Sequence, residues 1–260
     1  MSNQAQRSYT DFTPFQITFL LFFSISIFGA FLIPFLIKEP LDFVIISIVG
    51  LISAISGVFA IVYQARAQAI CLLLMIINTI TYGTIAFISH AYGQTFIQWF
   101  IMVPIQLYGY IVWKSSAKSN KVSDDRIKIK KFNLTNWTYT IIGLAAGTII
   151  YTIFLYTFPL IMKGLFNIDV ARDTSPIIDS LTGMLALVAM IVTAKGYFEQ
   201  WIIWISSNLI GTALFAGGLF QASHFSAGVI SSDIFSLLVQ LQYFIGSIYG
   251  MYLWRQLYKM

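Results

Sequence analysis

The chain has 260 residues and a formal net charge of +5, with 58% apolar and only 10% charged residues. Because soluble proteins carry about 25% charged residues, this composition excludes a soluble enzyme, a nucleic-acid-binding domain and a disordered chain. The single cysteine, Cys71, excludes a disulfide framework and a Cys-x-x-Cys metal site. We therefore expect no metal and no cofactor.

Long apolar stretches predict membrane-spanning helices, because about 20 apolar residues cross a bilayer core of about 30 Å. The first stretch follows a polar leader (Met1 to Pro14) and is too long for the apolar part of a signal peptide, so we expect it to be retained. In chain order the eight expected helices cover residues 15–37, 43–63, 70–88, 95–113, 139–161, 177–194, 200–220 and 234–254.

Lys and Arg are distributed unequally between the two sides of these spans. With the N-terminus inside, 12 of the 15 basic residues fall in inside segments and 3, namely Lys38, Lys163 and Arg172, in outside segments. Cytoplasmic loops carry the excess of Lys and Arg. Both termini are therefore expected to be cytoplasmic, and the long polar segment 114–136 is interpreted as a basic cytoplasmic loop, with binding of anionic lipid as the alternative role.

The sequence contains an internal repeat. The fourth expected helix ends in Tyr-Gly-x-x-x-Trp-basic at residues 108–114, and the eighth ends in the same pattern at residues 249–255. Asn78 in the third helix is matched with Asn208 in the seventh. Because a three-helix unit crosses the membrane an odd number of times, one intervening helix gives two units the same orientation.

We therefore predict an all-α integral membrane protein with eight transmembrane helices, formed by one extra N-terminal helix and a 3+1+3 parallel repeat. Parallel repeats related by an axis along the membrane normal are typical of transporters, with the substrate site near the midplane. Residues 1–41 hold the N-terminal tail and extra helix, and 42–114 the first repeat. Residues 115–165 hold the basic loop and linker helix, and 166–260 the second repeat and a short tail. The pairs Gly143/Gly147 and Gly246/Gly250 favour close helix contacts.

The interiors of the expected spans carry no Asp, Glu, Lys, Arg or His. Ion-coupled pumps usually bury such groups in the membrane, so their absence favours facilitated diffusion, although sodium can also be held by carbonyls and hydroxyls. It also argues against a membrane protease or another membrane enzyme.

The deep polar side chains are instead amides, hydroxyls and indoles. An unpaired amide in hydrocarbon costs several kcal/mol, so we expect these groups to face the interior of the bundle and to form a neutral, aromatic-walled site for a flat heteroaromatic ring with a carboxamide and a sugar. The spacing of four of them puts them on one face of the seventh helix. The candidate binding residues are Trp201, Trp204, Asn208, Gln106, Asn78, Tyr82, Thr212, Gln242 and Tyr243.

Each of these residue types has a structural alternative. Tryptophans near helix ends are most often interfacial, and we interpret Trp113 and Trp254 in this way. An Asn within the membrane often connects helices.

The Trp-x-x-Trp pair at Trp201 and Trp204, followed by Asn208 in a 3+1+3 arrangement, resembles the PnuC family of bacterial vitamin transporters over nearly the whole chain. The resemblance implies a fold similar to a full-length SWEET transporter, homotrimeric assembly in the bacterial inner membrane, and a binding role for the two tryptophans. It implies uptake of nicotinamide riboside by facilitated diffusion, with retention by cytoplasmic phosphorylation. The alternatives are a thiamine or riboflavin permease of the same fold, a sugar carrier, and a non-transporting membrane receptor.

Overall fold

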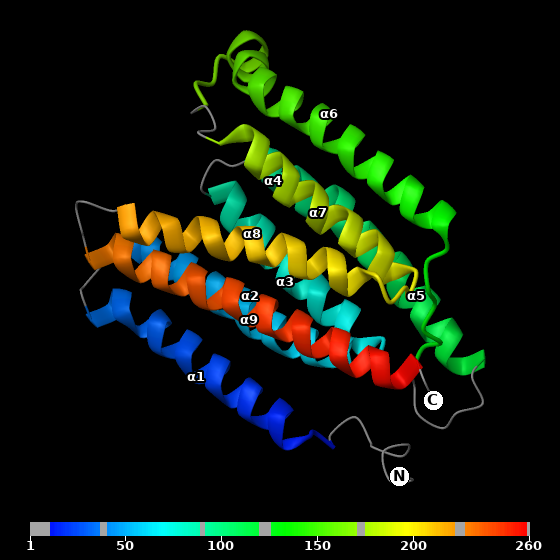
Figure 1. The fold of residues 1–260 in the computed structure, drawn as a ribbon. Coiled ribbons are helices and arrows are strands. Elements are labelled where there is room, and N and C mark those ends of the chain that lie inside the picture. Colours follow the sequence, from blue (N-terminus) through cyan, green and yellow to red (C-terminus); the bar gives the residue numbers. More distant parts are fainter. Residues whose placement is uncertain are drawn as a thin grey trace.

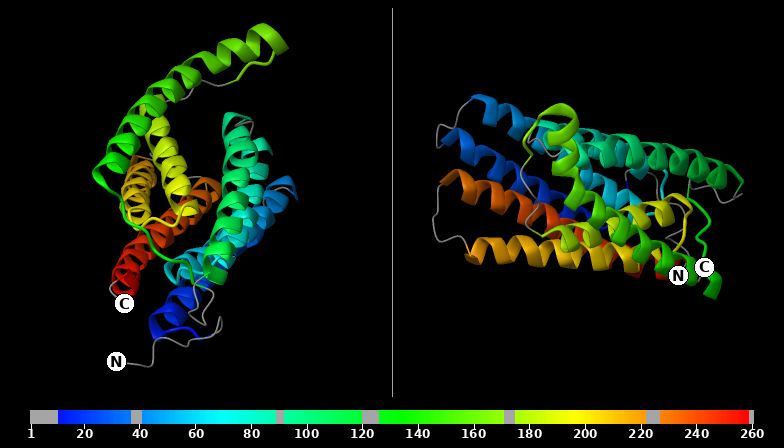
Figure 2. Two further views of the ribbon diagram at one scale, coloured as in Figure 1. Left: turned by 90° about the vertical axis from the view of Figure 1, so that its right-hand side faces the viewer. Right: turned by 90° about the horizontal axis from the view of Figure 1, so that it is seen from above.

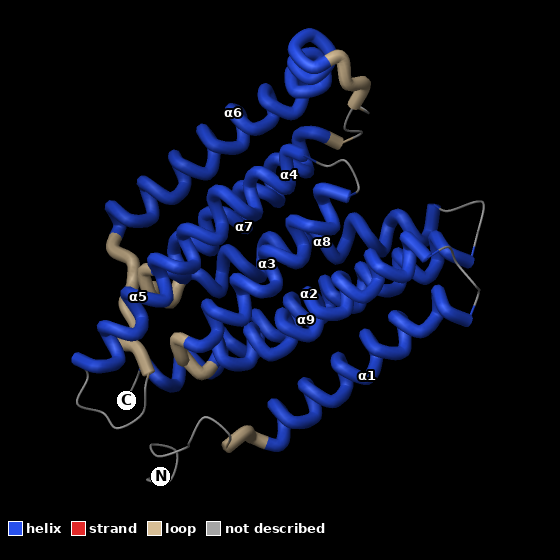
Figure 3. Tube along the Cα trace, turned by 180° about the vertical axis from the view of Figure 1, so that it is seen from behind, coloured by secondary structure: helices blue, strands red, loops and turns tan. Residues whose placement is uncertain are grey.

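The computed structural model of the protein describes residues 11–36, 41–88, 92–119, 126–170, 175–221 and 227–258. The regular structure of these ranges is helical (Figure 3). In chain order the elements are α1 (Pro14–Leu36), α2 (Leu41–Ala65), α3 (Ile70–Ile88), α4 (Tyr92–Phe96), the π-helical turn η1 (Ile97–Met102), α5 (Val103–Ser119), α6 (Leu134–Phe166), α7 (Pro176–Ala194), α8 (Gln200–Gln221) and α9 (Ala227–Tyr258).

The all-helical prediction is confirmed, and each expected helix corresponds to an observed one. Several helices are longer than their apolar stretch: α6 has 33 residues and α9 has 32. α5 continues to Ser119, so the first residues of the expected basic loop are helical. Seven segments of the described chain are long and apolar enough to cross a bilayer. The count does not include α8, of which only part has described side chains.

The fourth expected span is one continuous helix with a π-helical turn in it. The backbone N–H of Val103 donates to the carbonyl of Gln98, five residues earlier, and the next residue, Pro104, has no N–H to donate. Within this turn the indole of Trp99 donates to the carbonyl of Ile80 on α3 at 3.1 Å. Such turns are common at functional sites, and this one sets the rotation of α5.

The helices form two groups of three that meet at two contacts. α2, α3 and α5 are neighbours, and so are α7, α8 and α9; α2 packs against α9, and α5 against α7. α1 lies against α2 and α9, whereas α6 packs on α7 at the outside of the bundle (Figures 1 and 2). None of the residues of α6 is buried, so this helix presents most of its apolar surface outwards.

The turns that follow α2 and α7 have the same structure. The N–H of Ala67 donates to the carbonyl of Gln64, and the N–H of Gly196 donates to that of Thr193. Both turn residues have positive φ angles, 58° at Ala67 and 74° at Gly196, as in a helix end closed by a left-handed residue. The equivalent positions, 64 and 193 or 67 and 196, are 129 residues apart.

The chain between α5 and α6 joins these two turns. Ile127 donates its N–H to the carbonyl of Ala67 at 3.1 Å, and Lys130 donates to that of Gly196 at 3.0 Å. Phe198 returns an N–H to Lys130 at 2.8 Å. We call this end of the bundle the basic end, because it gathers Arg66, Lys114, Arg126, Lys128, Lys130, Lys131, Lys195 and Arg255. Arg7, Lys38, Lys121, Arg172 and Lys259 lie outside the described residues.

Glycines allow close helix contacts at some of the predicted places. A Cβ at Gly246 would meet the side chain of Ile61, and one at Gly250 would overlap the ring of Trp201. The prediction is thus confirmed for this pair. For the other pair, Gly147 faces Met184 but Gly143 faces nothing within 4 Å, so the expectation of close contact is wrong at Gly143.

Gly109 lies close to the backbone of α7, in the other helix group. A Cβ there would lie 2.9 Å from the Cα of Ala194 on α7. We expect Gly109→Ala to lower stability by about 1–3 kcal/mol through overpacking. Gly143→Ala is the control: its Cβ enters open space, and the better helix propensity of alanine stabilises by up to about 1 kcal/mol. Thermal unfolding in detergent measures both, and equal midpoints for the two variants would contradict the assigned contact.

Candidate functional site

Two buried hydrogen bonds connect helices deep in the bundle. The amide Nε2 of Gln106 on α5 donates to Thr79 Oγ1 on α3 at 2.7 Å, and the amide Nδ2 of Asn208 on α8 donates to Ser247 Oγ on α9 at 3.0 Å. Thr79 and Asn208 are 129 residues apart, the same separation as the two turns. The two bonds therefore occupy matching positions in the two groups of helices, with amide and hydroxyl exchanged.

A second pair of equivalent hydrogen bonds shows which residues of the two helix groups correspond. Asn78 Nδ2 donates to the carbonyl of Ser53 at 2.8 Å, and Ser207 Oγ donates to that of Thr182 at 3.4 Å; each bond spans 25 residues of sequence. Asn78 therefore corresponds to Ser207. The predicted match between Asn78 and Asn208 is wrong by one residue, because sequence reasoning matched amide with amide whereas the structure matches an amide with a hydroxyl.

The two tryptophans of the Trp-x-x-Trp pair have different surroundings. Trp204 is half-buried and donates its indole N–H to Thr193 Oγ1 on α7 at 3.0 Å. Trp201 is fully buried and lies edge-on to Trp254, with ring centroids 5.7 Å apart. Trp204 is thus the tryptophan of the pair that has exposed surface.

Gln106 and Trp204 approach the same stretch of α7. Gln106 Nε2 lies 3.8 Å from the sulfur of Met190, one turn before Thr193. Asn208 lies one turn beyond Trp204 on α8. Gln106 therefore reaches the end of α7 from the other helix group, and Trp204 and Asn208 follow one another along α8 in the α7–α9 group.

Several buried polar atoms in this region have no partner in the described part of the chain. Gln242 is fully buried, and neither its Oε1 nor its Nε2 has a well-aligned hydrogen-bond partner in the described part of the chain, although the hydroxyl of Tyr243 lies close to it; Gln106 Oε1 and Trp201 Nε1 also have no such partner. A Cβ at Gly57 of α2 would lie 3.1 Å from Gln242 Nε2 and would overlap the hydroxyl of Tyr243. Buried polar groups normally have partners, so these atoms offer donors and acceptors to a ligand or to water.

Two of the predicted binding residues have surroundings that differ from those of the others. Tyr82 is 44% exposed, so it does not share the burial of the other members. The hydroxyl of Thr212 donates to the carbonyl of Asn208 on its own helix.

The tryptophans at the ends of α5 and α9 close the basic end. Trp113 donates its indole N–H to the carbonyl of Thr193, and Trp254 donates to that of Gln64, both at 2.9 Å. Both side chains are fully buried, so their interpretation as interfacial residues is wrong. Gln64 in turn donates from Nε2 to Gln200 Oε1 at 2.8 Å.

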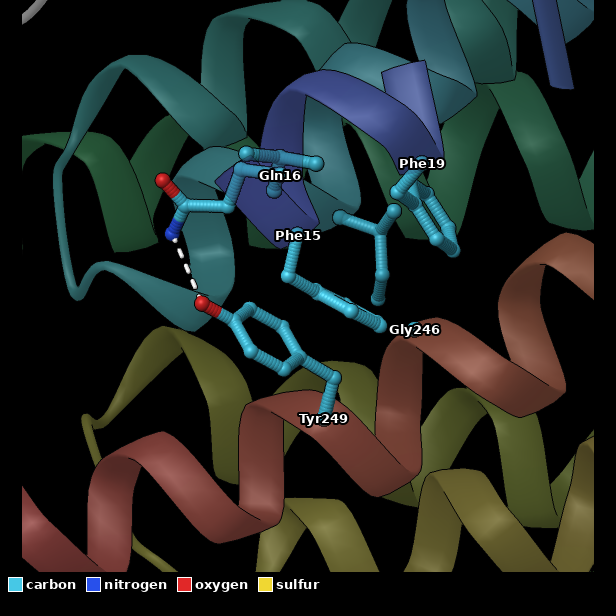
Figure 4. A pocket seen from close by; sticks show the side chains of 7 residues that line it. Phe15, Gln16, Phe19, Gly246 and Tyr249 are labelled. Carbon is cyan, nitrogen blue, oxygen red and sulfur yellow. Dashed lines mark hydrogen bonds between the residues drawn. The ribbon is translucent and has the colours of Figure 1, made fainter. Parts of the chain in front are cut away.

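A narrow crevice lies elsewhere, between α1, α2 and α9 (Figure 4). Gln16 Nε2 donates to the hydroxyl of Tyr249 at its edge at 3.0 Å, and the ring of Phe15 stacks on that tyrosine. The crevice is mostly apolar, and none of the predicted binding residues lines it.

Comparison with known proteins gives consistent matches. The family described as nicotinamide mononucleotide transporter matches residues 47–256. The nicotinamide riboside transporter PnuC of Neisseria mucosa is 22% identical over 80% of this chain and 72% of its own length. That of Haemophilus influenzae is 24% identical over 98% of this chain and 95% of its own. A crystal structure of the vitamin B3 transporter PnuC has the same fold, with a TM-score of 0.68 and 21% identity over 96% of this chain and 94% of that one.

The unpartnered amide of Gln242 gives a stability test. Gln242→Met keeps the side-chain length and removes polar atoms that no neighbour satisfies, so we expect the ligand-free protein to be as stable or more stable. Gln64→Met is the matched control: it leaves Gln200 Oε1 without its donor and should cost about 1–3 kcal/mol. Thermal unfolding of both variants without ligand decides; a large loss for Gln242→Met would show that its amide is paired.

Proposed function

The chain belongs to the nicotinamide mononucleotide transporter family, and we propose that it imports nicotinamide riboside across the bacterial inner membrane by facilitated diffusion. The observation that carries this proposal is a set of buried, uncharged amides and indoles in the two helix groups, several of whose polar atoms have no hydrogen-bond partner in the described part of the chain. The relatives named above are described as carriers of the same compound.

The chemistry of the site suits this substrate. A carboxamide is both donor and acceptor, and so are the side chains of Gln106, Asn208 and Gln242. The pyridinium ring carries a positive charge, which the face of an indole attracts by about 0.5–2 kcal/mol. The proposed binding residues are Trp201, Trp204, Asn208, Gln106, Gln242 and Tyr243, with Asn78, Tyr82 and Thr212 as less direct members.

Electrostatics distinguish the riboside from the mononucleotide. A phosphate carries about −1.5 to −2 charges at pH 7, and a buried anion needs a positive partner. The spans carry no Lys or Arg in their interiors; the described basic side chains gather mainly at the basic end. The site therefore accepts the riboside and rejects its phosphate ester.

This selectivity also explains retention without energy coupling. With no Asp, Glu, Lys, Arg or His in the span interiors to bind a driving ion, the substrate moves down its own gradient. Phosphorylation in the cytoplasm then converts it into an anion that the site does not return.

We further propose that the chain is a 3+1+3 repeat with eight spans. α2, α3 and the helix from α4 to α5 form one unit, α7 to α9 form the other, α6 links them and α1 is additional. The hydrogen bonds that recur 129 residues later in the sequence support this division. The basic end and both termini face the cytoplasm, and the outward surface of α6 is available to lipid or to the other subunits of a homotrimer.

A thiamine permease of the same fold is the second candidate, since thiamine is also a cationic aromatic compound that indoles would attract. A panel of nicotinamide riboside, its mononucleotide, thiamine and riboflavin separates these functions. Only a ligand that binds the folded protein raises its unfolding temperature.

We expect Trp204→Ala to abolish specific binding of nicotinamide riboside while the protein remains folded and membrane-inserted, because the variant loses the indole that faces the ring. The control is Trp137→Ala on α6, whose indole lies edge-on to Phe132 and is not one of the proposed binding residues. Isothermal titration calorimetry on purified protein measures both. Unchanged affinity of Trp204→Ala would remove this residue from the site.

Flux in proteoliposomes should need no ion gradient. We expect labelled nicotinamide riboside to equilibrate at equal internal and external concentrations, at a rate insensitive to sodium and to a proton ionophore. Accumulation above the external concentration would contradict facilitated diffusion, and binding without flux would indicate a receptor.

A further inference from the structure

Thr193, at the end of α7, forms two hydrogen bonds through its hydroxyl and two through its backbone carbonyl. Its hydroxyl donates to the carbonyl of Ala189 at 2.7 Å and accepts the indole N–H of Trp204 at 3.0 Å. Its carbonyl accepts from Gly196 and from the indole of Trp113. The side chain is fully buried, so water does not compete for these positions.

The hydroxyl of Thr193 can act only as an acceptor towards Trp204. Because its proton is used by the carbonyl of Ala189, the oxygen presents lone pairs towards α8. An indole N–H is a donor only, so Trp204 matches this acceptor. A Thr hydroxyl that bonds the carbonyl four residues earlier also has a fixed χ1 angle, which fixes the direction of the acceptor.

The carbonyl of Thr193 connects the same point to the other helix group. Carbonyls in the last turn of a helix lack intrahelical partners. Besides the N–H of Gly196, the carbonyl of Thr193 accepts the indole N–H of Trp113 on α5 at 2.9 Å. The half-buried indole of α8 and the closing indole of α5 are thus both held by one residue of α7.

We propose that Thr193 is a positioning residue that orients the indole of Trp204 for the aromatic ring of the substrate. This inference rests on the proposed function, since it takes Trp204 as part of the binding site. Thr193 does not touch the substrate; it limits rotation of the indole about its side-chain bonds, so that less orientational freedom is lost when the ring binds.

The test uses Thr193→Val, which keeps the shape of the side chain and its backbone carbonyl, and therefore also the bond from Trp113. We expect nicotinamide riboside to bind about three- to tenfold more weakly, the range given by one hydrogen bond. Thr193→Ser keeps the hydroxyl and should restore the affinity. The control is Thr152→Val, which removes a similar hydroxyl-to-carbonyl bond within α6 and should leave affinity unchanged.

A double-mutant cycle tests whether Thr193 affects binding through the indole N–H of Trp204. Trp204→Phe removes the indole N–H, so adding Thr193→Val to it should weaken binding no further. An equal loss in both backgrounds, or wild-type affinity for Thr193→Val, would overturn the proposal.

Intrinsic tryptophan fluorescence separates this result from the proposed function. Loss of the hydrogen bond to Trp204 should shift the emission of ligand-free Thr193→Val, and the shift should vanish in the Trp204→Phe background. If the wild-type protein binds none of the vitamins, the proposed function fails, but the emission shift still supports the claim that Thr193 holds the indole of Trp204. If the emission of Thr193→Val is unchanged, that claim fails, whichever ligand the protein binds.

Discussion

A polar side chain within the hydrocarbon layer of a membrane must find its partner inside the protein, because no water is there to replace one. This constraint accounts for the way in which the helices of this protein meet. Ser53 and Asn78 join α2 to α3, Thr79 and Gln106 join α3 to α5, and Asn208 and Ser247 join α8 to α9. Apolar packing alone gives little preference for one helix rotation over another in lipid, whereas each of these bonds specifies one.

The same constraint separates the polar groups into two kinds. Those with complete partners set the geometry of the helices. Those without, such as both amide atoms of Gln242, carry a desolvation cost in the ligand-free protein. A binding site in a membrane protein has to keep some groups of the second kind, since an amide that is already paired has nothing to offer a carboxamide. Stability and binding thus make opposite demands on the same residue types.

The sequence was sufficient to predict the helices and the burial of Gln106, Asn208 and Gln242, because apolar length and the cost of leaving an amide unpaired in hydrocarbon can be read from residue types alone. The sequence was insufficient where the role of a residue depends on the neighbours that the fold brings to it. Trp113 and Trp254 stand at helix ends, as interfacial residues do, and only the packing shows that they are buried against the opposite helix group. The match of Asn78 with Ser207 was missed because an amide and a hydroxyl can fill the same hydrogen-bonding position, which identity of residue type does not reveal.

At residues 64 and 193, the two helix groups make the same backbone contact but different side-chain contacts. Residues 64 and 193 both accept an indole N–H through their carbonyls, so the closing contact is common to both groups. Their side chains have diverged: Gln64 crosses to Gln200, whereas Thr193 orients Trp204. A substrate with a ring at one end and a sugar at the other has no twofold symmetry. A repeat that binds it must therefore keep the symmetric contacts for closing the bundle and give up symmetry in the side chains that surround the ligand.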